Sequence, residues 1–250
     1  MQSLFPTDPS EVTDEDLVEL YAYPSESTWV RANFVSSVDG AAQGIRGRSG
    51  ELSPSADQKL FALLRSLADV ILVGGQTARV EGYQPVLPSE VDGALRARLG
   101  LTATPAIAVV SRAMDFDPGL LAGGAAPTLV MTTAVAAEQH ADVLAGATVI
   151  DAGRPGDPVH VDAGRIIDEL AARGYQRILC EGGPSLHYGL VVSGRLDELC
   201  LTINSQLAGG DPLRILTAGP YFEPPIRLEL RHLLTEDGDL FCRYTTERHR

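Results

Sequence analysis

Three short turns in the sequence have residue types that suit an anion. Gly74-Gly75-Gln76-Thr77 follows the apolar run DVILV, Ser111-Arg112 follows AIAVV, and Glu181-Gly182-Gly183-Pro184 follows RILC. Glycine amides at the start of a helix leave N–H donors and a partial positive charge facing outward. One such turn could serve chain reversal alone. Three turns after equivalent runs favour convergence on one phosphate-bearing ligand.

The segments around these turns alternate between apolar runs and helical periodicity. We expect strands within residues 29–38, 69–75, 106–111, 128–133, 147–151 and 177–183, and helices over 54–67, 134–144 and 163–173. This alternation predicts an α/β fold with a mixed, mainly parallel sheet and helices on both faces. The carboxyl ends of such strands line the ligand crevice. Residues 226–234 and 239–247 flank Asp237-Gly238 and predict an antiparallel C-terminal hairpin.

The N-terminal 28 residues are polar and contain several prolines, which indicates an arm. Within this arm, Thr13 and Asp16 have the spacing of a capping box and predict a short helix. We expect residues 29–250 to form a single domain, since no linker or repeat divides them. Two segments rich in Pro and Gly, 84–93 and 152–158, are interpreted as surface loops.

Composition excludes several classes of partner. The chain has 250 residues and a net charge of −13, which argues against nucleic acid or an anionic membrane surface. A small anion remains compatible, because it needs only a few Arg side chains and oriented amides. No apolar run has transmembrane length and no signal segment is evident, so we expect a cytoplasmic protein. The three scattered cysteines predict core packing and no metal site.

Three strings together resemble a known family. They are SSVDG (36–40), LRSLADVILVGGQT (64–77) and ILCEGGPSLHYGLVVSGRLDELCLTI (178–203). The chain, from about residue 29 onward, resembles the reductase domain of riboflavin biosynthesis, the C-terminal half of RibD proteins. That resemblance implies a dihydrofolate-reductase-like fold, a homodimer and an NADPH-dependent reductase of the 5-amino-6-(5-phosphoribosylamino)uracil reductase type. The substrate would be a pyrimidine whose ribose is reduced to ribitol.

The resemblance also assigns cofactor-binding residues. Gly74, Gly75 and Thr77 would hold the cofactor's phosphates, Ser111 and Arg112 would meet the adenosine 2′-phosphate, and Gly182, Gly183, Pro184, Ser185 and Leu186 would clamp the pyrophosphate at a helix start. Charge-assisted hydrogen bonds from Arg contribute about 1.5 to 3 kcal/mol, enough for about a tenfold to hundredfold preference for NADPH over NADH. A solvated surface charge is the competing interpretation of Arg112.

Reduction by hydride also requires an acid, because protonation makes the acceptor carbon more electrophilic. Asp39 lies in Ser-x-Asp-Gly, on a loop that the fold would place over the nicotinamide, although an Asp-Gly turn explains it equally well. Asp57, with Phe61 four residues on, is similar to the proline-acid-phenylalanine helix that carries the proton-relay acid of dihydrofolate reductases. A favourable charge in the first helical turn is its alternative role.

Glu181 ends a buried strand, where an unpaired acid is unfavourable, so it serves either the substrate or a structural hydrogen bond. Asp57, Asp39 and Glu181 are therefore the catalytic candidates. Asn33, Ser37 and Glu81 are the candidates for substrate binding. Glu81 stands where the family usually carries the acid of an Asp-Asn-Pro motif, and Asn33 stands where bifunctional RibD proteins carry Lys.

Three other functions remain open. The Asn at position 33 and the pair Asp57–Phe61 would suit a dihydrofolate reductase-like pterin reductase. An NADP-binding sensor or partner protein without turnover would retain the cofactor motifs while its substrate motifs drifted. A structural α/β domain would use the glycines only to turn the chain.

Overall fold

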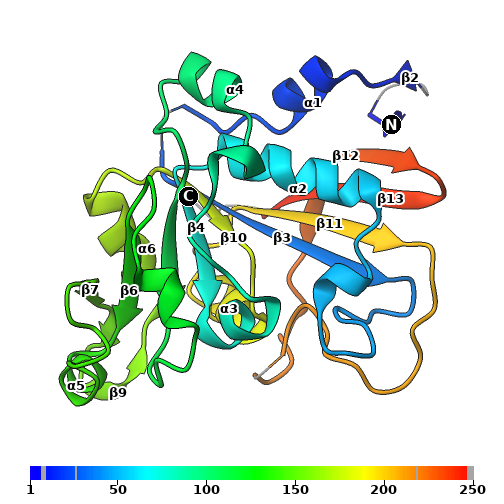
Figure 1. Ribbon diagram of the computed structural model, residues 1–250. Coiled ribbons are helices and arrows are strands. Elements are labelled where there is room, and N and C mark those ends of the chain that lie inside the picture. The colour runs from blue at the N-terminus through cyan, green and yellow to red at the C-terminus, as the bar shows by residue number, and fades with distance from the viewer. Residues whose placement is uncertain (7–9, 26, 218, 247–250) are drawn as a thin grey trace.

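The computed structural model describes residues 1–6, 10–25, 27–217 and 219–246. Within these residues one sheet has the strand order β2-β1-β12-β13-β11-β3-β10-β4-β5-β6-β7 (Figure 1). Its strands are β1 (Gln2–Phe5), β2 (Ser10–Glu11), β3 (Trp29–Ser37), β4 (Val70–Gly74), β5 (Ala106–Val110), β6 (Thr128–Thr132), β7 (Thr148–Asp151), β10 (Arg177–Cys180), β11 (Glu198–Asn204), β12 (Leu228–Glu236) and β13 (Asp239–Thr246).

The seven strands from β11 to β7 in this order are parallel to their neighbours, and the strands from β2 to β11 pair antiparallel. β12 and β13 form the expected hairpin, and both residues of its turn have positive φ, 52° at Asp237 and 88° at Gly238. Asp-Gly is a favoured pair at such a turn. The mixed sheet predicted from the sequence is confirmed.

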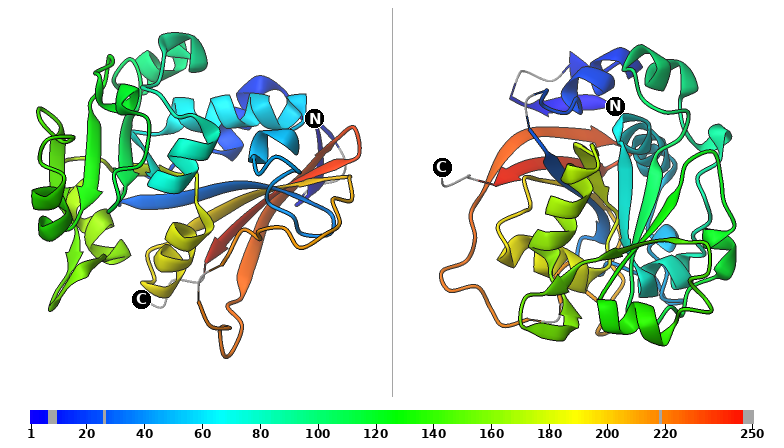
Figure 2. Two further views of the ribbon diagram at one scale, coloured as in Figure 1. Left: turned by 60° about the horizontal axis from the view of Figure 1, so that its bottom comes forward. Right: turned by 90° about the vertical axis from the view of Figure 1, so that its left-hand side faces the viewer.

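Alternating side chains of each parallel strand enter different layers of the core. Val70 and Leu72 pack with α6 (Ala163–Ala172) and α7 (Pro184–Val192). Ile71 and Val73 point to the other face, which is covered by α1 (Asp14–Leu20), α2 (Ser55–Leu67), α3 (Gly75–Glu81) and α4 (Gly93–Arg98). Figure 2 shows α2, cyan, and α7, yellow, on opposite sides of β3, blue. Helices therefore cover both faces, as expected from strands buried on both sides.

The N-terminal segment packs onto the antiparallel edge of the sheet. Thr13 caps α1 and forms the predicted capping box with Asp16, whose N–H donates to Thr13 Oγ1 at 3.2 Å. β1 pairs antiparallel with β12. The buried side chain of Arg31 joins the two regions, because it donates to the carbonyl of Tyr21 at 2.7 Å and to Glu198 at 2.5 Å. The domain boundary at residue 28 stays a prediction.

Two local expectations were wrong. Residues 152–158 do not form an irregular loop, since β8 (Gly153–Arg154) and β9 (Asp157–Val161) make a separate two-stranded hairpin around Pro155-Gly156. Pro followed by a Gly with positive φ, here 76°, suits a tight two-residue turn. The helix expected over 134–144 is shorter: α5 (Ala134–Gln139) ends early, and the chain continues in turns up to Gly146, whose φ is 82°.

No helix in the described part of the chain is both long enough and apolar enough to span a bilayer. All three cysteines are free and buried, as their positions in apolar runs predicted. Within the described residues, no group of three or more His, Cys, Asp or Glu side chains is arranged to hold a metal ion.

Candidate active site

One cleft of about 1870 Å³ runs along the carboxyl ends of the parallel strands. It is bordered by the residues that follow β4, β5 and β10, where the three turns were expected to converge. All ten expected cofactor residues line it: Gly74, Gly75, Thr77, Ser111, Arg112, Gly182, Gly183, Pro184, Ser185 and Leu186. Asn33, Asp57, Glu81 and Glu181 line it as well, whereas Ser37 and Asp39 do not belong to its lining.

The glycine turns pack directly against one another. The N–H of Gly74 donates to the carbonyl of Gly182 at 2.8 Å. A Cβ atom at Gly183 would lie 2.6 Å from Thr77 Oγ1, and one at Gly75 would lie 2.8 Å from Ser111 Oγ. Such distances exclude a side chain at either position unless the neighbour moves. The turns therefore form one surface of backbone amides at the start of α7.

Arg112 extends from this surface toward the β8–β9 hairpin. Its side chain is exposed, and Nη1 donates to the carbonyl of Val159 at 3.0 Å. Ser111 is buried, and its Oγ accepts from the N–H of Met114 at 3.0 Å, which fixes the turn after β5. A guanidinium has five N–H donors, so Arg112 retains several for an anion in the cleft.

Glu181 is held by a buried ion pair at the end of β10. Arg65 Nε donates to Oε1 and Arg65 Nη2 to Oε2, both at 2.8 Å, and Tyr83 Oη donates to Oε2 at 2.6 Å. Burial lowers the pKa of Arg65, but the Glu181 carboxylate outweighs that effect and raises it overall. The three groups connect β10 to α2 and to the segment after α3. Most hydrogen-bonding capacity of Glu181 is thus used inside the protein.

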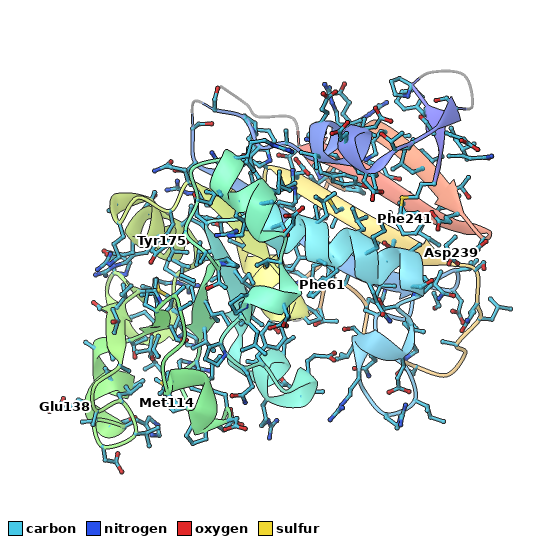
Figure 3. The ribbon with its side chains drawn as sticks, turned by 45° about the horizontal axis from the view of Figure 1, so that its top comes forward. Phe61, Met114, Glu138, Tyr175, Asp239 and Phe241 are labelled. Atoms are coloured by element: carbon cyan, nitrogen blue, oxygen red, sulfur yellow. The ribbon has the colours of Figure 1, made fainter. Side chains whose placement is uncertain are left out.

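Asp57 has a different environment, near the start of α2. Its side chain is buried, with hydroxyl groups of Ser53 and Thr202 donating to its two oxygens, the latter at 2.6 Å. Burial raises the pKa of Asp57 although both hydrogen bonds lower it, and the charge of Asp239 raises it further. Figure 3 shows Asp239 near the N-terminal end of α2 and Phe61 further along that helix. A cleft-lining carboxyl group with a raised pKa is suited to donate a proton.

Asp39 connects two loops outside the cleft lining. Its carboxylate accepts from Ser37 Oγ and from the N–H groups of Ala208 and Gly209, at 3.1 and 2.7 Å. These hydrogen bonds, that of Ser37 first, lower the pKa of Asp39 to about 2. The carboxylate is therefore ionised at neutral pH. Catalysis by Asp39 and substrate binding by Ser37 stay predictions.

The two other expected substrate residues, Asn33 and Glu81, line the cleft from different elements. Glu81 ends α3, and its Oε1 accepts from the N–H and the Oγ of Ser49 at 2.7 and 2.9 Å. Asn33 lies in β3 opposite Cys200 of β11, two residues before Thr202. Glu81 therefore holds the loop after β3, and the role of each residue toward a substrate stays a prediction.

The partners of these acids were not identified from the sequence. Arg65, Tyr83, Ser53 and Thr202 are the groups that determine what Glu181 and Asp57 can do. One signal was available for Arg65: an acid at the end of a buried strand requires a buried cation, and Arg65 lies in the string LRSLAD. Thr202 lies on β11 and Asp57 on α2, 145 residues apart in the chain, so only the tertiary structure shows that they are in contact.

The comparison with protein families gives a match over most of the chain. The model of the RibD C-terminal domain matches residues 28–241. The chain belongs to the RibD C-terminal domain family. The resemblance inferred from the three sequence strings is therefore confirmed.

Relatives of this RibD-type domain agree in sequence and fold. A 2,5-diamino-6-ribosylamino-4(3H)-pyrimidinone 5′-phosphate reductase of Methanothermobacter thermautotrophicus is 27% identical over 224 residues, covering 88% of this chain and 98% of the relative. A solved pyrimidine reductase-like protein of Corynebacterium diphtheriae has a TM-score of 0.75 and 28% identity, covering 88% of this chain and 92% of that one. Dihydrofolate reductase of Enterococcus faecalis, with a TM-score of 0.50 and 13% identity over 88% of this chain and 97% of that one, shows the shared fold alone.

Proposed function

We propose that this RibD-type domain is an NADPH-dependent reductase of a phosphorylated ribosylaminopyrimidine in riboflavin synthesis. One observation carries the proposal: the amide surface of the two glycine turns, with Ser111 and Arg112 beside it, and the buried acid Asp57 line the same cleft. Named relatives reduce 2,5-diamino-6-ribosylamino-4(3H)-pyrimidinone 5′-phosphate. That compound or its deaminated uracil counterpart is the proposed substrate.

The residues present fit a nicotinamide dinucleotide. Cβ atoms at Gly75 and Gly183 would clash with Ser111 and Thr77, so glycine at these positions lets the turns pack together, and the start of α7 presents N–H groups beside them. Gly74, Thr77, Ser185 and Leu186 complete this cradle. When bound, the cofactor supplies a hydride. The proposed preference for NADPH over NADH rests on Arg112 beside Ser111.

In the proposed reaction, Asp57 donates the proton that activates the substrate for reduction. Its raised pKa keeps the acid protonated to higher pH than an exposed Asp, and Ser53 and Thr202 fix its orientation. Glu181 holds the end of β10 through Arg65, so that the glycine turn keeps its place. Asn33 of β3 and Glu81 of α3 are proposed to contact the substrate in the cleft.

A pterin reductase is the second candidate. Asp57 and Phe61 lie on one helix and both line the cleft, and Asn33 supplies an amide where a phosphate-binding Lys would stand. A buried acid is what protonation of a pterin ring nitrogen requires. NADP binding without turnover remains the candidate of another class. The expected homodimer and cytoplasmic location stay predictions.

The deciding experiment measures NADPH oxidation by the purified protein with three substrates side by side: the diaminopyrimidinone phosphate, the corresponding uracil, and dihydrofolate. The wild type is compared with Asp57→Asn and with Glu229→Gln, a control whose side chain is 59% exposed and binds Arg231 away from the cleft. Turnover of either pyrimidine that is lost only in Asp57→Asn supports the proposal. Turnover of dihydrofolate alone supports the second candidate, cofactor binding without oxidation supports a sensor, and absence of cofactor binding contradicts all three.

A further inference from the structure

The β8–β9 hairpin forms one wall of the cleft and is attached firmly to the rest of the domain. Arg165 of α6 donates from Nη1 to the carbonyl of Gly153 at 3.0 Å, and the N–H of Ala152, just before β8, donates to the carbonyl of Thr132 in β6 at 2.7 Å. Figure 1 shows β9 next to α5, at the end of the sheet formed by β6 and β7. These contacts give the hairpin a fixed position opposite the turn after β5.

Basic side chains from β8, from β9 and from the turn after β5 line the cleft at this wall. Arg154 of β8 and His160 of β9 line the cleft together with Arg112, and Arg112 binds the backbone of β9 through the carbonyl of Val159. Both hairpin side chains are accessible, 56% exposed for Arg154 and 58% for His160. The chain as a whole carries a net charge of −13, so this gathering of bases is local.

Two carboxylates accompany the bases. Asp157 Oδ2 lies 2.7 Å from His160 Nδ1 and 4.0 Å from Arg154 Nη1, and Asp157 does not belong to the cleft lining. This carboxylate therefore orients the two bases from behind. Asp162 does line the cleft, but its Oδ1 caps α6 by accepting from the N–H of Arg165 at 2.9 Å. Arg112, Arg154 and His160 thus remain available for an anion in front of the hairpin.

Apolar side chains line the cleft on the α6 side of these bases, and we call this part of the cleft the apolar slot. Val161, Ala163 and Ile166 line it, and α7 contributes Leu186. The two helices approach closely here, since a Cβ atom at Gly189 would lie 3.2 Å from the Cβ of Ala163. A flat aromatic ring fits an apolar slot of this kind, and a phosphate attached to its sugar would meet the basic side chains.

We propose that the β8–β9 hairpin determines the choice between the two nicotinamide cofactors. Arg154 and His160, with Arg112, bind the phosphate monoester on the adenosine ribose, and the adenine occupies the slot beside Val161. This inference rests on the proposed function, because it assumes that the cleft holds a nicotinamide dinucleotide. It adds two specificity residues from a segment that carries none of the strings by which the family was recognised.

The test compares Arg154→Gln, His160→Gln and the double variant with the wild type. Arg173→Gln is the control, since Arg173 pairs with Glu169 outside the cleft lining and is similarly exposed, at 40%. Calorimetry measures binding of 2′,5′-ADP and of 5′-AMP, and steady-state kinetics measures KM for NADPH and for NADH. We expect each hairpin substitution to weaken 2′,5′-ADP and NADPH about tenfold, because each removes a charge-assisted bond to phosphate. Binding of 5′-AMP and the KM for NADH should change far less.

The outcomes separate this inference from the proposed function. If the variants bind 2′,5′-ADP as tightly as the wild type, or lose both nucleotides equally, the hairpin does not select the phosphate, and NADPH oxidation by the wild type is unaffected by that result. If the wild type binds neither nucleotide, the proposed function fails together with the inference. A wild type that reduces its substrate with NADH as efficiently as with NADPH overturns the inference together with the proposed preference for NADPH, but leaves the reductase activity itself supported.

Discussion

Replacing Glu181 by Gln distinguishes an acid that holds the cleft together from one that takes part in the chemistry. The side chains of Glu181 and Arg65 are 2% and 11% exposed, and two hydrogen bonds of 2.8 Å join them. Gln keeps the shape and an acceptor for Tyr83 but removes the charge. Arg65 is then left with Glu90, at 3.3 Å and 42% exposed, as its remaining carboxylate partner.

The expected loss follows from this geometry. Removing one partner of a buried ion pair destabilises a protein by about 3 to 5 kcal/mol, and Glu90 places the effect near the lower end, about 3 kcal/mol. For a domain of this size, that corresponds to a fall in Tm of about 6 to 12 °C. The free energy of unfolding is measured in urea, and kcat and KM are measured at a temperature where the variant is folded. We expect kcat to fall less than about tenfold, because a positioning residue does not transfer the proton.

A matched control is Glu90→Gln, which removes the exposed partner of the same guanidinium. Its effect should stay within about 1 kcal/mol, as for other exposed pairs. The reasoning is refuted if Glu181→Gln unfolds at the same urea concentration as the wild type while kcat falls more than about a hundredfold, the range expected for loss of a general acid. Glu181 would then belong to the chemistry.

Three further predictions concern the acids and the glycine surface. Asp57→Asn should lower kcat by about a hundredfold to ten-thousandfold. Because the pKa of Asp57 is raised in the folded state, the wild type loses stability as pH rises through that pKa. Urea unfolding should therefore show the free energy of unfolding of Asp57→Asn increasing relative to that of the wild type from acid to neutral pH, and a constant difference would contradict this. The pKa of Asp39 is lowered to about 2, so Asp39 should contribute stability that is lost as pH falls from about 4 toward that value. Asp39→Asn should therefore flatten the dependence of the free energy of unfolding on pH in this range, and an unchanged dependence would contradict the loop contacts. Gly183→Ala places a Cβ 2.6 Å from Thr77 Oγ1 and should weaken cofactor binding by about 1 to 3 kcal/mol, as measured by calorimetry. The double variant Gly183→Ala/Thr77→Ala should recover part of this loss. An unchanged affinity in the single variant would contradict the close packing of the two turns.

The fold could be predicted from the sequence because its strands are specified locally. Val70 to Val73 form a continuous apolar run since both faces of the sheet are covered, and the Asp237-Gly238 turn specifies the hairpin. The convergence of the two glycine turns and the Ser111-Arg112 turn also followed from the sequence, since parallel strands that are neighbours end at one edge. Residues 152–158 were interpreted as a loop because they are rich in Pro and Gly, and the strands that Pro155-Gly156 joins are too short and too exposed to produce an apolar run.

The roles of the acids could not be predicted in the same way. Glu181 and Arg65 are 116 residues apart in the chain, and Asp57 and Thr202 are 145 apart. No local pattern relates such residues, and only the tertiary structure shows that Glu181 is paired while Asp57 is surrounded by neutral hydroxyl groups. Asp39 shows a related limit, because a Ser-x-Asp-Gly string does not reveal that its carboxylate binds the amides of Ala208 and Gly209.

The position of β11 has a consequence for the order in which the domain is completed during synthesis. β3 leaves the ribosome early, yet its two neighbours in the sheet, β10 and β11, are among the last parallel strands to be made. Until residue 202 has emerged, Asp57 lacks its hydroxyl partner on β11, and an incomplete chain exposes both edges of β3. Pairing between segments so distant is slow and leaves intermediates prone to association. A chain in which Asp57 has both of its hydroxyl partners has therefore been made and folded at least as far as β11.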